Sequence, residues 1–248
     1  MEKIMIITGS SRGIGAATAC IAAERGYAIC VNYLHQQKAA NNIVDSITQN
    51  GGKAIAVAAD IASETEVIHL FKTVDRQLGR VSALVNNTGI LAQQMRVENM
   101  NAARLNRVFA TNITGSFLCA KEAIKRMSTK YGGTGGAIVN VSSAASRLGS
   151  PNEYVDYAAS KGAIDTMTIG LAKEVAEEGI RVNAVRPAFI DTDIHASGGE
   201  PNRIERVKEF IPMKRGGQPI EVAKAILWLL SDEASYTTGS FIDVAGGK

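Results

Sequence analysis

Short apolar runs alternate along the chain with longer segments in which apolar residues recur at helical spacing. Most of the runs are continuously apolar, which is typical of strands buried on both faces of a parallel sheet. We expect strands at residues 3–7, 28–33, 53–58, 83–86, 137–141, 181–185 and 240–244. We expect helices at residues 14–25, 36–50, 64–78, 100–130, 157–178 and 219–231.

This alternation predicts the α/β class, as a single-domain, Rossmann-like, doubly wound parallel sheet of about seven strands flanked by helices. No repeat, low-complexity tract or linker divides residues 1–248. The least regular segment is 191–214, where Gly198, Gly199, Pro201 and Pro212 surround a short helix expected at 202–210. A long insertion of this kind predicts a binding loop or a lid over a substrate.

The composition is that of an ordinary globular protein, with 46% hydrophobic and 21% charged residues. The net charge is only +3 and no basic stripe is present, so we expect no nucleic-acid partner. No apolar run reaches the length of a membrane span, and no charged leader precedes the first strand. The widely spaced Cys20, Cys30 and Cys119 predict reduced thiols, a cytoplasmic location and no metal site.

A glycine-rich segment, Thr8-Gly9-Ser10-Ser11-Arg12-Gly13-Ile14-Gly15, joins the first strand to the first helix. Glycines permit a tight turn and the close approach of a pyrophosphate, and a helix N-terminus offers unpaired N–H groups. The first glycine interval is wider than in the common Gly-x-Gly-x-x-Gly, and a simple strand–helix turn is the alternative. We predict a dinucleotide site that uses Gly9, Ser11, Arg12, Gly13, Ile14 and Gly15.

The end of the second strand bears on the choice of cofactor. A carboxylate there would bind the ribose 2′-hydroxyl of NAD and repel the 2′-phosphate of NADP. This chain reads Val31-Asn32-Tyr33-Leu34-His35, with no acidic residue before Asp45. Together with Arg12 and Lys38 this favours NADP(H), contacted by Asn32 and Tyr33, and NAD(H) is the alternative. Without a ligand, Arg12 would be a surface charge and Asn32 a cap.

Polar residues also follow the third and fourth strands. Asp60, beside Ile61, could hold an adenine amino group or cap the helix that begins near Ser63, and the sequence leaves both open. The motif Asn86-Asn87-Thr88-Gly89 ends the fourth strand, where amides can tie strand ends together and Gly89 lets a ribose approach. As a bare sequence this motif would only be a turn.

Tyr157 and Lys161 lie four residues apart in a helical segment, which places them on one face. A free phenol has a pKa of about 10, and a nearby ammonium favours its phenolate. Ser142-Ser143 ends the fifth strand, where a hydroxyl can bind the substrate oxygen that Tyr157 protonates, although a cap is the alternative. With the glycine loop upstream, this pair predicts proton transfer coupled to hydride transfer.

Taken in order, the glycine loop, Asn-Asn-x-Gly, the strand-end serine, Tyr-x-x-x-Lys and the Pro187 turn resemble the short-chain dehydrogenase/reductase family, from Ile4 to Gly247. The chain is most similar to the glucose 1-dehydrogenase-like and 3-oxoacyl-carrier-protein reductase-like members. Three departures are Thr88 in place of alanine, Ala188 in place of glycine, and one extra residue near 150–153. We expect that extra residue to shape the substrate pocket.

The resemblance implies a catalytic tetrad of Asn112, Ser143, Tyr157 and Lys161. Tyr157 would be the general acid or base, Lys161 would lower its pKa and bind the nicotinamide ribose, and Ser143 would polarise the carbonyl. Asn112 would hold a water that links Lys161 to solvent. Without the resemblance, the sequence around Asn112 indicates only a polar residue in a helix. Pro187, Ile190 and Thr192 would lie along the nicotinamide.

The resulting prediction is one NAD(P)-binding catalytic domain, residues 1–248, with a lid around 191–214. The protein would act on a small-molecule carbonyl or secondary alcohol, prefer NADP(H) and form a homotetramer. We expect it to bind neither nucleic acid nor a membrane. The alternatives are an NAD(H)-preferring sugar dehydrogenase, a silent nucleotide sensor that would lack tetrad residues, and a methyltransferase-like enzyme that would need no Tyr–Lys pair. Expected pocket residues are Gln93, Gln94, Arg147, Tyr154, Phe189 and His195, and we interpret His195 as a surface residue of the lid.

Overall fold

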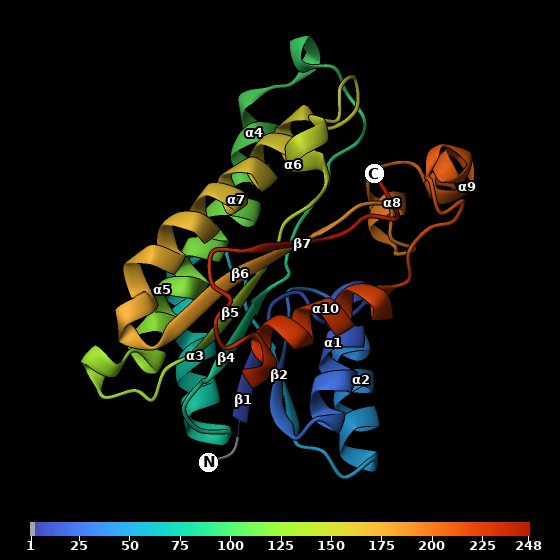
Figure 1. The fold of residues 1–248 in the computed structure, drawn as a ribbon. Helices are drawn as coiled ribbons and strands as arrows, with labels where there is room; N and C mark the ends of the chain where they lie inside the picture. Colours follow the sequence, from blue (N-terminus) through green and yellow to red (C-terminus); the bar gives the residue numbers. More distant parts are fainter. Residues whose placement is uncertain (1–2) are drawn as a thin grey trace.

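The computed structural model describes residues 3–248 and contains one seven-stranded sheet between two layers of helices (Figure 1). The strands are β1 Lys3–Ile7, β2 Tyr27–Tyr33, β3 Ala54–Ala58, β4 Ala83–Asn86, β5 Gly136–Val141, β6 Ile180–Pro187 and β7 Phe241–Val244. The α-helices are α1 Gly13–Glu24, α2 Gln37–Gln49, α3 Glu64–Gln77, α4 Ala102–Phe109, α5 Gly115–Met127, α6 Ala145–Leu148, α7 Val155–Val175, α8 Ile194–Ser197, α9 Arg203–Val207 and α10 Pro219–Leu230.

The sheet has the strand order β3-β2-β1-β4-β5-β6-β7, and every pair is parallel. The order reverses between β1 and β4, so the connections that follow these two strands leave on opposite sides. Ligands of open α/β sheets bind at such a switch point, beyond the carboxyl ends of the strands. The predicted doubly wound sheet is confirmed.

Two apolar cores hold the layers together. One core lies between the sheet and α3, α5 and α7, and includes Phe71, Met127 and Ile164. The other lies between the sheet and α1, α2 and α10, and includes Ile47 and Ile226. Figure 1 shows these two helix groups on opposite faces of the sheet. Because both faces are covered, the strands carry continuous apolar runs, as the sequence pattern requires.

The segment expected as one helix at 100–130 is divided in the structure. A π-helical turn, Ala110–Thr114, separates α4 from α5. A Cβ on Gly115 would lie 2.7 Å from the Ile61 side chain, so the helix passes closely over the end of β3. Such π turns insert one extra residue and often accompany functional sites. The short helix expected at 202–210 is α9 followed by a 3₁₀ turn, and α8 was not expected.

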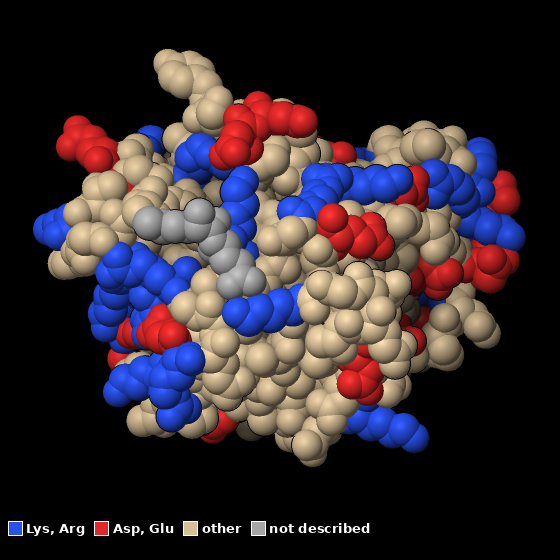
Figure 2. Space-filling model, turned by 90° about the horizontal axis from the view of Figure 1, so that it is seen from below, with Lys and Arg blue, Asp and Glu red and all other residues tan. Residues whose placement is uncertain are grey.

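Charge is distributed without a dominant patch on the face shown in Figure 2, where basic and acidic side chains are interspersed. None of the helices formed by residues 3–248 is long and apolar enough to cross a membrane.

Candidate functional site

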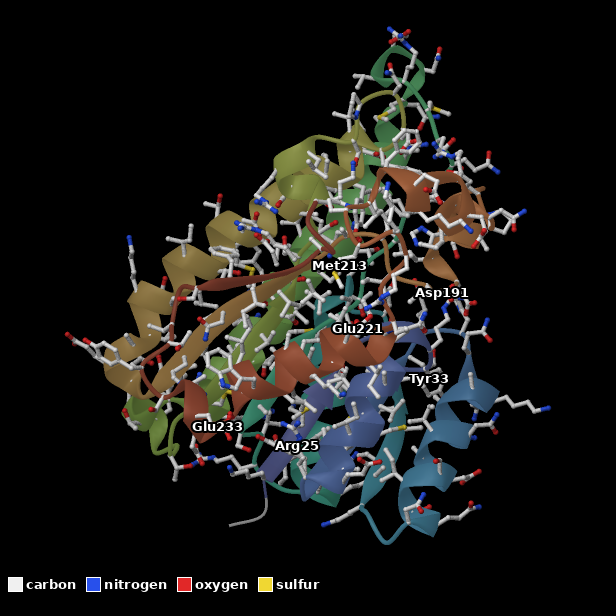
Figure 3. All side chains as sticks on the ribbon, turned by 45° about the vertical axis from the view of Figure 1, so that its right-hand side comes forward. Arg25, Tyr33, Asp191, Met213, Glu221 and Glu233 are labelled. Atoms are coloured by element: carbon white, nitrogen blue, oxygen red, sulfur yellow. The ribbon has the colours of Figure 1, made fainter. Side chains whose placement is uncertain are left out.

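A cavity of about 1020 Å³ lies at the carboxyl ends of the strands. Its walls are the glycine loop, the ends of β2, β4, β5 and β6, and the segment after β6. Figure 3 shows Tyr33, at the end of β2, and Asp191, after β6, at this end of the molecule, with Arg25 and Glu233 at the opposite end. All the predicted site residues except Gly15 line the cavity or, in the case of Asn112, support its wall.

The glycine loop is shaped so that side chains are excluded from it. Gly9 and Gly13 have φ angles of +59° and +58°, which favour glycine. A Cβ on Gly15 would lie 2.6 Å from Asn87 Nδ2 and 2.7 Å from Ser10 Cα. Arg12 begins α1 in an extended conformation without a side-chain cap, so the first helical N–H groups are available. This cradle fits a pyrophosphate group.

Asn87 fixes the loop from the neighbouring strand. Its Nδ2 donates to Thr8 O at 2.8 Å and Gly9 O at 3.0 Å. Asn86 Nδ2 donates to Asn140 Oδ1 of β5 at 2.9 Å. The expectation that these amides tie strand ends together is confirmed. Gly89 brings the chain near Lys161, because a Cβ there would lie 3.3 Å from Lys161 Nζ.

Asn32 supports the loop with its side chain rather than offering it to a ligand. Its Oδ1 accepts from Gly9 N at 3.2 Å, and its Nδ2 donates to Val57 O and Ala59 O at 3.3 and 3.1 Å. Tyr33 and Arg12 line the cavity nearby. The Arg12 guanidinium is half-exposed and 3.8 Å from the Asp193 carboxylate, across the cavity mouth. This long surface contact leaves the guanidinium available to an anion.

Asp60 makes a turn that precedes α3. Its Oδ1 accepts from Ala62 N at 2.9 Å, while Ser63 is the residue that precedes the first turn of α3. The proposed capping role of Asp60 is therefore wrong. Its carboxylate and the buried Ile61 lie in the cavity wall.

Tyr157 and Lys161 lie on the same face of α7, with Nζ 5.6 Å from the centre of the phenol ring. Lys161 Nζ donates to Val141 O at 2.7 Å, and burial lowers its pKa to about 8 against the opposing effect of Asp165. Burial raises the pKa of Tyr157, with Ser143 and Arg203 acting to lower it. The expected lowering of the Tyr157 pKa by Lys161 is not found, because the loss of hydration on burial dominates.

Asn112 is placed by the π turn between α4 and α5. Its Oδ1 accepts from Ile90 N at 2.8 Å, and its Nδ2 donates to Ile90 O and Ser160 Oγ, both at 3.1 Å. These bonds connect the turn to the chain after Gly89 and to α7. Asn112 therefore fixes the position of the helix that carries Tyr157 and Lys161.

The two serines after β5 have different surroundings. Ser143 lines the cavity, and its side-chain hydrogen bond to the Tyr157 phenol acts to lower the pKa of that phenol. Ser142 Oγ donates to Asp165 Oδ1 at 2.6 Å, and Asp165 pairs with Arg186 at 3.0 Å. The geometry therefore favours Ser143 over Ser142 as the serine of the site, in agreement with the tetrad that the resemblance implies. The Asp165–Arg186 ion pair was not predicted, because no local sequence motif indicates it.

The segment after β6 closes the cavity. Pro187, Ile190 and Thr192 line it, and Thr192 Cγ2 would be 3.4 Å from a Cβ on Gly13. The following residues are held to the loop before α7 by ion pairs. These pairs join Arg203 and Arg206 to Glu153 and Glu200. Tyr154 Oη donates to Gly198 O at 3.1 Å.

The expected pocket residues divide into two groups. Gln93 and His195 line the cavity, whereas Gln94, Arg147, Tyr154 and Phe189 do not. The interpretation of His195 as a surface residue is wrong, since it is only 8% exposed. The rings of Tyr154 and Phe189 stack under the Arg203 guanidinium instead. The residues that the structure describes contain no cluster of metal-ligating side chains.

Sequence comparisons agree with this geometry. Residues 9–248 match the family described as "Enoyl-(Acyl carrier protein) reductase". The chain is 62% identical to "Uncharacterized oxidoreductase YgfF" of Escherichia coli (strain K12), with 99% of each chain covered. It is 40% identical to "3-oxoacyl-[acyl-carrier-protein] reductase" of a Synechocystis strain, covering 99% of this chain and 96% of the relative. It is 38% identical to "Glucose 1-dehydrogenase 2" of Bacillus subtilis (strain 168), covering 99% and 94%.

Solved structures give the same result. A dehydrogenase/reductase from Sinorhizobium meliloti 1021 superposes with a TM-score of 0.91 at 30% identity, covering 99% of this chain and 94% of the other. A short-chain dehydrogenase/reductase from Serratia marcescens superposes with a TM-score of 0.90 at 28% identity, covering 99% and 97%. The chain therefore belongs to the short-chain dehydrogenase/reductase family and is an oxidoreductase, in a family whose enzymes use NAD(P).

Proposed function

We propose that the protein is an NADP(H)-dependent reductase of small-molecule carbonyl compounds in which Tyr157 is the general acid. The observation that carries this proposal is the convergence of Tyr157, Ser143 and Lys161 in one cavity with the glycine cradle. Burial raises the pKa of Tyr157, so its phenol is protonated near neutral pH and able to donate to a carbonyl oxygen. The same group would act as base in the reverse reaction.

The other tetrad residues have distinct roles in this proposal. Ser143 donates a second hydrogen bond to the carbonyl oxygen and stabilises the charge that develops there. Lys161, with a pKa of about 8, is largely cationic at neutral pH and lies where it can bind a ribose hydroxyl. Asn112 fixes α7 and the chain at Ile90, and so orients Lys161. The nicotinamide cofactor, when bound, supplies the hydride.

Cofactor binding would use the glycine cradle for the pyrophosphate and the segment Pro187–Thr192 for the nicotinamide. The preference for NADP(H) is supported by the absence of a carboxylate at the end of β2 and by the half-exposed Arg12. We expect the NADPH dissociation constant to be at least tenfold below that of NADH. Arg12→Ala should reduce that ratio, whereas Arg25→Ala, at the far end of the molecule in Figure 3, should not. Equal affinities in the unmodified protein would contradict the preference.

The decisive experiment is NADPH and NADH oxidation with a panel of aldehydes, ketones, keto esters and acetoacetyl thioesters. Tyr157→Phe should lower kcat/KM by about 100- to 10,000-fold, the usual contribution of a general acid. Nucleotide affinity and melting temperature should stay close to those of the unmodified protein, which separates chemistry from folding. A variant that still turns over at the original rate would refute the role of Tyr157.

An NAD(H)-preferring sugar dehydrogenase is the second candidate. It is favoured by the similarity to a relative named glucose 1-dehydrogenase and by the Asn32 side chain, which is occupied inside the protein and is not offered to a 2′-phosphate. Oxidation of glucose with NAD⁺, together with tighter binding of NADH than NADPH, would support it over the first candidate.

We also propose that residues 1–248 form one catalytic domain with 191–214 as its lid, and that the protein is a cytoplasmic homotetramer. The free cysteines support the location. Exposed apolar side chains on two faces support the assembly: Phe117 and Ile169 on α5 and α7, and Ile220 and Trp228 on α10. Light scattering after gel filtration tests the assembly, and Phe117→Glu should lower the measured mass.

A further inference from the structure

A poorly solvated ion pair adjoins the tetrad where α7 meets the ends of β5 and β6. Asp165, one helical turn after Lys161, accepts from Ser142 Oγ at 2.6 Å. The same carboxylate accepts from Arg186 Nη2 at 3.0 Å and from Arg186 Nε at 3.1 Å. The Asp165 and Arg186 side chains are only 14% and 16% exposed. One carboxylate therefore joins α7 to the chain after β5 and to the end of β6.

Ser142 links this carboxylate to two residues of the proposed reaction centre. Its preceding residue is Val141, whose carbonyl oxygen accepts from Lys161 Nζ at 2.7 Å, and its following residue is Ser143. Ser142 Oγ also lies 3.2 Å from the Lys161 carbonyl oxygen. The 2.6 Å contact with Asp165 has the length of a charge-assisted hydrogen bond, which is stronger than a bond between neutral groups. Asp165 therefore fixes the chain that carries both the acceptor of Lys161 and the hydroxyl of Ser143.

Arg186 connects the same carboxylate to the end of β6. It precedes Pro187, whose carbonyl oxygen accepts from Ala144 N at 2.9 Å and from Ser143 Oγ at 3.4 Å. The guanidinium lies over the Phe241 ring of β7, 3.8 Å from its centre, which restricts its position further. Ser143 is thus held from two sides, by its own chain and by Pro187, and both sides are bonded to the one carboxylate.

The charges around Lys161 point to the same residue. Burial lowers the pKa of Lys161 to about 8, and the negative charge of Asp165 acts against this lowering. On α7 the ammonium also faces the Tyr157 phenol, at 5.6 Å from the ring centre. From β6 the carboxylate faces Arg186, which in turn lies 3.9 Å from Asp243 of β7. Asp165 is therefore shared between a fixed cation and the lysine of the site.

Stability does not account for this arrangement. Loss of hydration offsets the attraction between two charges that are removed from water, so a buried ion pair is weak evidence for stability. Neither Asp165 nor Arg186 lines the cavity, so neither contacts a bound substrate or cofactor. What the pair does provide is a fixed relation among three backbone segments that carry residues of the reaction centre.

We propose that Asp165 is a positioning residue for carbonyl reduction, which keeps Lys161 and Ser143 in their reactive arrangement. It acts through Ser142 and Arg186 and touches no reacting atom. This rests on the proposed function, in which Ser143 binds the carbonyl oxygen and Lys161 binds the ribose. A displacement of about 1 Å at such groups can cost about 100-fold in rate.

Two substitutions test the two parts of this role. Asp165→Asn removes the charge with little change of shape, and its Oδ1 can still accept from Ser142. Ser142→Ala removes the hydroxyl and leaves the ion pair with Arg186 in place. The matched control is Asp75→Asn, because Asp75 on α3 pairs with Arg126 on α5 at 2.7 Å and neither residue lines the cavity.

The first measurement is steady-state kinetics with NADPH and the carbonyl compound of the panel that has the highest kcat/KM. Asp165→Asn should lower kcat about 10- to 100-fold at pH 7. KM should change little, because the lost interaction supports the transition state and not substrate binding. Ser142→Ala should lower kcat less, and the double variant should lose little more than Asp165→Asn alone, since both act on one segment. Asp75→Asn should retain the kcat of the unmodified enzyme.

The pH profile distinguishes positioning with charge from a purely structural role. Asp165→Asn removes the charge that raises the Lys161 pKa, so Lys161 loses its proton at lower pH. The alkaline decline of kcat should therefore move to lower pH by about half a unit or more. Ser142→Ala and Asp75→Asn both keep the Asp165 carboxylate and should leave the decline in place.

A further measurement needs no substrate. At pH 7, Lys161→Met should raise the urea midpoint of unfolding more in the Asp165→Asn background than in the unmodified protein. The reason is that a buried cation without its carboxylate destabilises the fold more. In the Asp75→Asn background, the gain from Lys161→Met should equal the gain in the unmodified protein.

Four outcomes would overturn the proposal. They are an unchanged kcat in Asp165→Asn, an unshifted pH profile in that variant, an equal loss of kcat in Asp75→Asn, or equal gains from Lys161→Met in every background. If one of them occurs while Tyr157→Phe still lowers reduction, the proposed function stands and only the role of Asp165 is lost. If Tyr157→Phe has no effect on any substrate, the proposed function itself fails.

Discussion

The two halves of the cavity are built by different means. The half proposed to bind the cofactor consists of strand ends and a glycine loop held by partly buried amide–backbone hydrogen bonds, such as those of Asn32 and Asn87. The half formed by residues 191–214, the proposed lid, is held by ion pairs in which Glu153, from the loop before α7, and the nearby Glu200 face Arg203 and Arg206. The first half depends on backbone geometry and the second on side-chain charge.

This difference indicates which half of the cavity tolerates amino-acid substitutions. The closely packed backbone of the glycine loop leaves no space for a side chain, since a Cβ on Gly15 would lie 2.7 Å from Ser10 Cα. Ion pairs at a partly exposed surface contribute little each, because water screens them. We therefore expect small substitutions to weaken cofactor binding strongly and the proposed lid to tolerate them.

The largest effect should come from Gly15→Ala in the cofactor half. The added Cβ would meet Ser10 Cα and Gly9 O at 2.7 and 3.0 Å, so the loop must shift. We expect nucleotide affinity to fall at least 100-fold by fluorescence titration, with a stability loss of about 1–3 kcal/mol. Gly170→Ala, in α7 with no atom near its Cβ, should be neutral or stabilising by up to about 1 kcal/mol. Equal effects of the two substitutions would contradict the contrast.

A large stability effect is expected at the boundary between the halves. Arg104 on α4 donates to both carboxylate oxygens of Asp156, at 2.8 and 3.3 Å, and both residues are buried. Asp156→Ala leaves a buried guanidinium unpaired, which should cost about 3–5 kcal/mol. Urea denaturation measures the loss. The double variant Arg104→Met/Asp156→Leu should recover most of it, and no recovery would mean that the pair itself is stabilising.

Lys161→Met should separate stability from activity. Burial lowers the Lys161 pKa from 10.5 to about 8, so the cation destabilises the fold at pH 7 by about 3 kcal/mol at most. The variant should lose turnover at least 100-fold while unfolding at the same or higher urea concentration. Between about pH 8 and 10.5 the unfolded chain binds the proton more tightly, so the unmodified protein gains stability relative to the variant as pH rises.

The same pKa predicts a decline of carbonyl reduction above about pH 8, where Lys161 loses its proton.

Lys173→Met, on the exposed side of α7, is the control for the stability measurement and should shift the free energy of unfolding by less than about 0.5 kcal/mol at each pH. A stability difference between Lys161→Met and the unmodified protein that does not change with pH would show that folding does not lower the pKa of Lys161.

The smallest effect is expected in the lid. Glu153→Gln removes the charge shared by Arg203 and Arg206 without changing side-chain size. The free energy of unfolding should fall by about 1 kcal/mol or less. KM for substrate should rise a few-fold, and trypsin should cleave within residues 191–214 faster. Glu205→Gln, on α9, where Glu205 pairs with Lys208, is the control. A tenfold change in nucleotide affinity would show that the halves are not independent.

The sequence by itself determined the strand–helix order, the doubly wound sheet and the residues that gather at the switch point. These follow from local signals: buried strands are continuously apolar, a pyrophosphate cradle needs glycines, and helical spacing pairs Tyr157 with Lys161. The family resemblance added Asn112, which no local pattern marks.

Only the tertiary structure decided what surrounds those residues. Whether His195 is exposed depends on how the segment after β6 folds against the cavity, and whether Asn32 faces a ligand depends on the β3 backbone and the residues just after it. The pKa of Tyr157 depends on burial, which a phenol–ammonium pair in sequence does not reveal. Hydration and long-range hydrogen bonds involve segments far apart in the chain, so no local pattern encodes them.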